Sequence, residues 1–142
     1  MNLKYIVRKR QLGDVLWAEP IIDEIALNYK KSVIQFITDY GFEKAIIIAP
    51  YPPSNFGVNN PRFPRNGLLS ERVLVTKNIT KCLVEISSKS FIVVENSREL
   101  STQNGSLDRN LTDDGVHLNS QGSDLIQNKI NFEIWKIDSV NK

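Results

Sequence analysis

The sequence has one cysteine, one histidine and one methionine among its 142 residues. A single cysteine, Cys82, excludes an internal disulfide and any metal site that needs several cysteines. A single histidine, His117, excludes a histidine-rich metal site. No hydrophobic stretch approaches the length of a membrane span, and the N-terminus lacks the uninterrupted apolar core of a signal peptide. We therefore expect a cytoplasmic protein with no metal, no cofactor and no membrane span.

The sequence also has little excess of positive over negative charge. The formal net charge is only +2, so neither nucleic acid nor an anionic membrane surface is an expected partner. Hydrophobic residues make up 41% of the chain and charged residues 24%, which is ordinary for a globular domain. The chain is long enough for one hydrophobic core and contains no internal repeat. These features predict a single domain over residues 1–142, with its oligomeric state left open.

Short hydrophobic runs alternate with amphipathic segments along the chain. The runs predict strands at residues 5–7, 45–49 and 91–94, and helical spacing predicts helices at 20–29, at 68–86 and after residue 119. Residues 33–40 fit a helix by spacing and a strand by composition, and we favour the helix, ended by Gly41. Cys82 falls on the apolar face of the 68–86 helix, so we expect it in the core. Continuous apolar runs are typical of parallel strands covered on both faces.

The histidine lies in the string Asp114-Gly115-Val116-His117. A carboxylate three residues before an imidazole, with glycine between them, can accept a hydrogen bond from one ring nitrogen and leave the other as a general base. Asp113 is the alternative partner. Asn119 or Ser120 is expected to cap the following helix, and the long polar connection over residues 96–116 is typical of a functional loop. A surface turn with a helix cap is the non-catalytic interpretation of the same residues.

The longer string from Asp114 to Asn119, followed by Gly122 and Leu125, resembles the last sequence block of SGNH/GDSL-type esterases and lipases. The resemblance covers about residues 44–130. It implies a three-layer α/β/α sandwich with a mainly parallel sheet, flavodoxin-like and incomplete here. It also implies ester hydrolysis, with acyl or acetyl esters of small molecules or glycans as substrates. In that family the aspartate orients the histidine, and the histidine activates a serine; Asp114 and His117 match these two positions.

The first 31 residues resemble a different family. A strand that includes Tyr5, then the turn Leu12-Gly13-Asp14 and a helix led by Pro20, resembles the opening of heptosyltransferase-type family 9 glycosyltransferases. The aspartate of that turn is the family's proposed base, and Asp14 matches it. In a GDSL alignment the same turn reads Gly-Asp-Val-Leu, which places Val15 at the nucleophile position.

Neither a Gly-Asp-Ser block nor a Gly-x-Asn-Asp block occurs in the sequence. Ser32, Ser54 and Ser70 lack the context of an activated nucleophile, and we nominate none of them. The leading hypothesis is a truncated or composite SGNH-type hydrolase, weakly active or inactive alone, from polysaccharide biosynthesis. The alternatives are a heptosyltransferase-like fragment that uses Asp14 and a non-catalytic α/β domain that binds a partner or a sugar. Since Asp14 and His117 match different families, we expect them not to share one organised site.

Overall fold

The computed structural model describes residues 7–9, 15–17, 19–56, 61–62 and 67–140. Along the chain the elements are β1 (Val7–Lys9), β2 (Val15–Trp17), α1 (Glu19–Tyr40), β3 (Ala45–Ile48), α2 (Leu69–Val84), β4 (Phe91–Val94), α3 (Ser97–Leu100), the 3-10 helix Arg109–Leu111 and α4 (Ser120–Val140). Helices and strands are mixed, as in an α/β protein. None of the described helices is long and apolar enough to cross a membrane.

The two predicted hydrophobic strands pair with each other. β3 and β4 form a parallel ladder in which Ala45 lies opposite Phe91 and Ile48 opposite Val94. Beyond the ladder, the Ala49 N–H donates to the Val94 carbonyl at 3.0 Å. The buried Asn96 side chain donates to the Ala49 carbonyl at 2.7 Å. The prediction of parallel strands at 45–49 and 91–94 is therefore confirmed.

The predicted three-layer sandwich is wrong, because in the described part of the chain each sheet has only two strands. β1 does not join β3 and β4; it pairs antiparallel with β2, with Val7 opposite Trp17. Tyr5, Ile6 and the turn at 11–14 lie outside the described residues. Within the described ranges β3 pairs with a strand on one side only, and Ile48 is 40% exposed. The expectation that both faces of this strand are covered is thus also wrong at Ile48.

The ambiguous segment at 33–40 is helical, as predicted, and forms the second half of α1. The helix ends at Gly41, whose φ of +67° lies in the left-handed region that glycine adopts at little cost. The Gly41 N–H donates to Thr38 O at 3.1 Å and the Phe42 N–H donates to Ile37 O at 3.2 Å. This pair of hydrogen bonds is a Schellman motif, which satisfies the last carbonyls of the helix.

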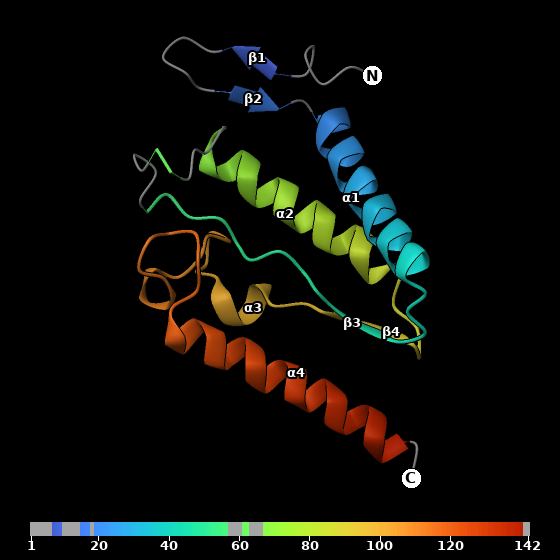
Figure 1. Cartoon of the computed structure of the whole chain (residues 1–142). Helices are drawn as coiled ribbons and strands as arrows, with labels where there is room; N and C mark the ends of the chain where they lie inside the picture. The colour runs from blue at the N-terminus through green and yellow to red at the C-terminus, as the bar shows by residue number, and fades with distance from the viewer. Residues whose placement is uncertain (1–6, 10–14, 18, 57–60, 63–66, 141–142) are drawn as a thin grey trace.

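The described core contains two hydrophobic clusters. The first joins α1, α2 and the sheet, and Cys82 packs against it as expected; its buried members are Ala26, Ala49, Ile79 and Leu83. The second joins the connection after β4 to α4; its buried members are Leu100, Leu107, Leu111 and Ile126. In Figure 1, α2 and α4 accordingly lie on opposite sides of β3 and β4.

The second cluster orders most of the connection that was predicted as a polar loop. This connection contains α3, the 3-10 helix and an isolated antiparallel bridge between Ser101 and Leu107. The far end of α4 makes fewer contacts: Trp135 is 61% exposed and stacks on Phe132 with ring centroids 5.9 Å apart. The ordered part of the connection is therefore the part that leads to His117.

We expect Leu100→Ala to lower the free energy of unfolding by about 2–5 kcal/mol, because Leu100 is fully buried in the second cluster. Leu27→Ala is the matched control, since Leu27 is 44% exposed on α1, and it should cost about 1 kcal/mol or less. Chemical denaturation of the two variants checks this. Equal losses would show that the second cluster does not hold the connection in place.

Candidate active site

The Asp114–His117 turn is closed at its base by backbone pairing. Thr112 and Leu118 form an antiparallel bridge, and the turn between them contains Gly115 with a φ of +81°. A Cβ atom at residue 115 would lie 1.9 Å from the carbonyl oxygen of Phe56. Glycine is thus required at residue 115 for two reasons: its positive φ, and the close approach of the chain after β3, which leaves no room for a Cβ atom.

The Asp114 carboxylate is hydrogen-bonded inside this turn, and the Thr112 hydroxyl lies 3.4 Å from its Oδ1. Its Oδ1 accepts from the backbone N–H groups of Val116 and His117, each at 2.8 Å. Its Oδ2 lies 2.7 Å from Nδ1 of the His117 ring. The predicted contact between Asp114 and His117 is therefore confirmed, and the alternative partner Asp113 is not the one used.

These hydrogen bonds favour the charged carboxylate. The bond from the His117 ring contributes most, followed by the two backbone N–H groups, and together they hold the pKa of Asp114 well below its usual range. A carboxylate can only accept, so Nδ1 of His117 carries the proton in this contact. In the neutral imidazole the basic lone pair then lies on Nε2, which is the arrangement that a general base requires.

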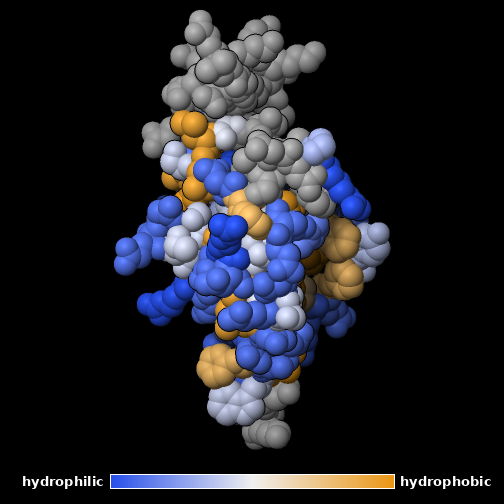
Figure 2. Space-filling view, turned by 90° about the vertical axis from the view of Figure 1, so that its left-hand side faces the viewer, coloured by the Kyte–Doolittle hydropathy of each residue, from blue (hydrophilic) through white to orange (hydrophobic). Residues whose placement is uncertain are grey.

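The histidine ring is exposed, whereas Thr112, which supports its turn, is buried. The His117 side chain is 65% exposed and that of Asp114 34%. Thr112 is buried; its hydroxyl donates to His117 O at 2.7 Å and accepts from the Gly115 N–H at 2.8 Å. The loop lies on the left in Figure 1, and Figure 2 shows that face as largely hydrophilic. A polar substrate in solution can therefore reach the ring.

A second segment clamps the turn from outside. The buried Ser54 hydroxyl donates to Gly115 O at 3.0 Å. Arg72 on α2 donates to Ser54 O at 2.9 Å and to Oδ1 of Asn55 at 2.6 Å. Sequence analysis missed Arg72 and this role of Ser54, because the contacts join segments far apart in the chain and no short motif contains them.

The three serines considered as nucleophiles are placed differently. Ser54 is brought to the loop, but it is only 4% exposed and its hydroxyl proton is directed at a backbone carbonyl. Ser32 and Ser70 are exposed on α1 and α2, outside the Asp114–His117 turn. Burial of Ser54 is the opposite of what an attacking hydroxyl needs, which agrees with leaving it unassigned.

The helix after the histidine is capped as the sequence predicted, by Asn119 rather than Ser120. The Asn119 Oδ1 accepts from the Gly122 N–H at 3.0 Å, and its Nδ2 donates to Asn110 O at 2.8 Å. This cap fixes the direction of α4 relative to the 3-10 helix. The turn that contains His117 is therefore anchored at both of its ends.

The remaining predicted site residue, Asp14, lies outside the described residues, so its separation from His117 stays a prediction. Among the residues that the structure does describe, no group of three or more histidine, cysteine, aspartate or glutamate side chains could hold a metal ion. Comparison of the chain with protein-family models, with curated proteins and with solved structures found no match.

The lowered pKa of Asp114 makes a testable contribution to stability. Its folded-state pKa is below the unfolded value, so its stabilisation is present above about pH 4 and is lost as the pH falls through the folded value. Asp114→Asn should therefore lower the melting temperature near neutral pH, and the difference from the parent should shrink on acidification below about pH 4. Thermal unfolding across a pH series measures this.

Asp113→Asn is the matched control, because Asp113 is the exposed neighbour that does not bond to the ring. Its melting temperature should follow that of the parent at every pH. A constant gap between Asp114→Asn and the parent, independent of pH, would show that the carboxylate charge does not stabilise the turn.

Proposed function

We propose that Asp114 and His117 form the acid–base half of an SGNH-type ester hydrolase site, with acyl or acetyl esters of small molecules or glycans as substrates. The observation that supports this is the 2.7 Å contact between Asp114 Oδ2 and His117 Nδ1, on an exposed ring. The resemblance of the string from Asp114 to Asn119 to the last block of that family supports the same assignment.

The proposed chemistry begins at Nε2 of His117. This nitrogen takes a proton from an attacking hydroxyl group while the oxygen forms a bond to the ester carbonyl carbon. The resulting imidazolium is stabilised by the Asp114 carboxylate, which stays ionised because of its hydrogen bonds. The proton then passes to the alkoxide as the ester bond breaks, so the base is regenerated and an acid and an alcohol are released.

The attacking hydroxyl determines the rate. No Gly-Asp-Ser block occurs in the sequence, so for this chain we assign water as the attacking group. A positioned general base contributes about two to four powers of ten. Loss of a serine nucleophile lowers the rate of a triad enzyme on the order of a millionfold. Each missing oxyanion donor lowers the rate by about two to three further powers of ten. The proposed hydrolase is accordingly weak when it acts alone.

One observation also favours the non-catalytic alternative, a binding domain. A cavity of about 420 Å³ lies beside Pro50, Thr80 and Glu95, none of which belongs to the Asp114–His117 turn. The heptosyltransferase-like alternative depends on Asp14, which lies outside the described residues.

Hydrolysis of p-nitrophenyl acetate tests the proposed function. We expect a trace rate that exceeds that of free imidazole at the same concentration, because Asp114 orients the ring. His117→Ala should remove this excess, and Asp114→Asn should reduce it by about tenfold or more. Asp113→Asn and Asp14→Ala should leave it unchanged.

Two results would contradict the proposal. If His117→Ala keeps the parent rate, the histidine is not the base. If the parent turns over rapidly and a serine-reactive phosphonate labels Ser32, Ser54 or Ser70, the chain has a serine nucleophile and water is not the attacking group.

A further inference from the structure

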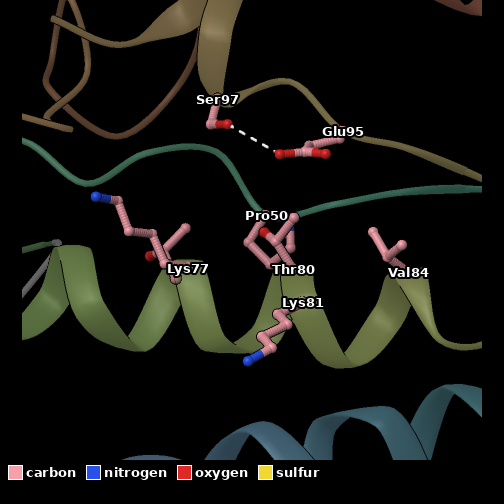
Figure 3. Close-up of a pocket in the computed structure, with 8 residues that line it drawn as sticks. Pro50, Lys77, Thr80, Lys81, Val84, Glu95 and Ser97 are labelled. Atoms are coloured by element: carbon pink, nitrogen blue, oxygen red, sulfur yellow. Dashed lines mark hydrogen bonds between the residues drawn. The ribbon is translucent and has the colours of Figure 1, made fainter. Parts of the chain in front are cut away.

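The described part of the chain contains a cavity at the carboxyl ends of β3 and β4, on the side covered by α2. Pro50 follows β3, Glu95 and Ser97 follow β4, and α2 contributes Lys77, Thr80 and Val84 (Figure 3). Its volume of about 420 Å³ is in the range of small-molecule sites. The carboxyl ends of parallel strands are also where open α/β sheets bind their ligands.

One polar side chain in this cavity is nearly buried and has no hydrogen-bond partner among the described residues. Thr80 is only 9% exposed. One turn earlier, the Thr76 hydroxyl donates to the Arg72 carbonyl at 3.0 Å, as threonines in helices commonly do. The Thr80 hydroxyl makes no hydrogen bond to any residue that the structure describes, and Figure 3 shows the side chain rising from α2 toward Pro50. Among the described residues the Thr80 oxygen is not one of the fully enclosed side-chain atoms without a partner, so it is open to the cavity and a ligand there can bond to it.

Opposite charges reach the cavity from its two sides. Lys77 comes from α2, and Glu95 comes from the segment after β4. The Ser97 hydroxyl donates to Oε1 of Glu95 at 3.3 Å, while neither Lys77 nor the Glu95 carboxylate forms an ion pair within the described ranges. The ring of Pro50 and the methyl groups of Val84 supply an apolar wall. The lining therefore offers two lysines of α2, Lys77 and Lys81, together with hydroxyl groups and a carboxylate around a hydrocarbon surface.

We propose that this cavity binds a small hydroxylated organic acid. The acid group of the ligand pairs with Lys77, its hydroxyl groups bond to Thr80 and to the Glu95–Ser97 pair, and its carbon skeleton packs on Pro50 and Val84. A neutral polyol lacks the acid group that pairs with Lys77. A simple dicarboxylate lacks hydroxyl groups that could donate hydrogen bonds to the Glu95 carboxylate. The proposal is independent of the ester hydrolase assignment, since neither Asp114 nor His117 lines the cavity.

Titration of the full chain with D-glucuronate, followed by the amide chemical shifts in NMR spectra, tests the proposal. We expect saturable binding at millimolar concentrations, with the largest shifts around Thr80 and Ser97. D-glucose, without the acid group, and glutarate, without hydroxyl groups, should each bind about tenfold more weakly or worse. His117→Ala should bind glucuronate as the parent does, so a failed esterase assay would leave this result standing.

Three variants complete the experiment. Thr80→Val keeps the side-chain shape and should weaken glucuronate binding by about two- to tenfold without lowering the melting temperature. Lys77→Met should weaken binding by about tenfold or more. Lys31→Met, at an exposed lysine of α1 outside the cavity, is the matched control and should leave binding unchanged. The proposal is overturned by the absence of saturable shifts, by equal binding of all three ligands, or by a Thr80→Val variant with parent affinity.

Discussion

The parallel pairing of β3 with β4 determines where the rest of the described chain can go. Because both strands run the same way, the chain leaves them at the same end of the sheet, once into the segment that contains Ser54 and once into the connection that leads to His117. Asn96 ties the two exits together through the Ala49 carbonyl, and the Leu107 N–H extends the tie to Pro53 O at 2.9 Å. The Asp114–His117 turn and the cavity beside Thr80 both depend on this joined end.

A two-stranded parallel sheet has little stability by itself, because each of its strands has one edge without a hydrogen-bonded neighbour in the sheet. Parallel sheets are also normally covered on both faces. Here the cover comes from helices, with α2 on one side and α4 on the other (Figure 1). The two hydrophobic clusters have different roles. The first holds α1 and α2 on the sheet. The second holds the ordered connection on α4, and Thr112 in this connection is buried while the His117 ring stays exposed.

Apart from the parallel pairing of β3 with β4, the details predicted correctly from the sequence are mostly those that local forces determine. The contact between Asp114 and His117 is formed within four residues, and the helix end at Gly41 needs only a glycine with a positive φ. The number of strands in the sheet was not predictable in this way, because a hydrophobic run does not specify its neighbours and the sandwich was inferred from a resemblance. Ser54 and Gly115 are 61 residues apart in sequence, so their contact follows from the tertiary fold.

The same distinction bears on what the Asp114–His117 pair means for catalysis. The pair is held by two backbone N–H groups of its own turn and by Thr112, so it forms without help from a nucleophile or a substrate. A pair of this kind supplies an oriented base at little cost in folding energy, because the exposed ring has not been desolvated. The base can then contribute only its own few powers of ten to ester hydrolysis. It follows that the attacking group, which we assign as water, and not the position of His117, limits the rate that this chain can reach.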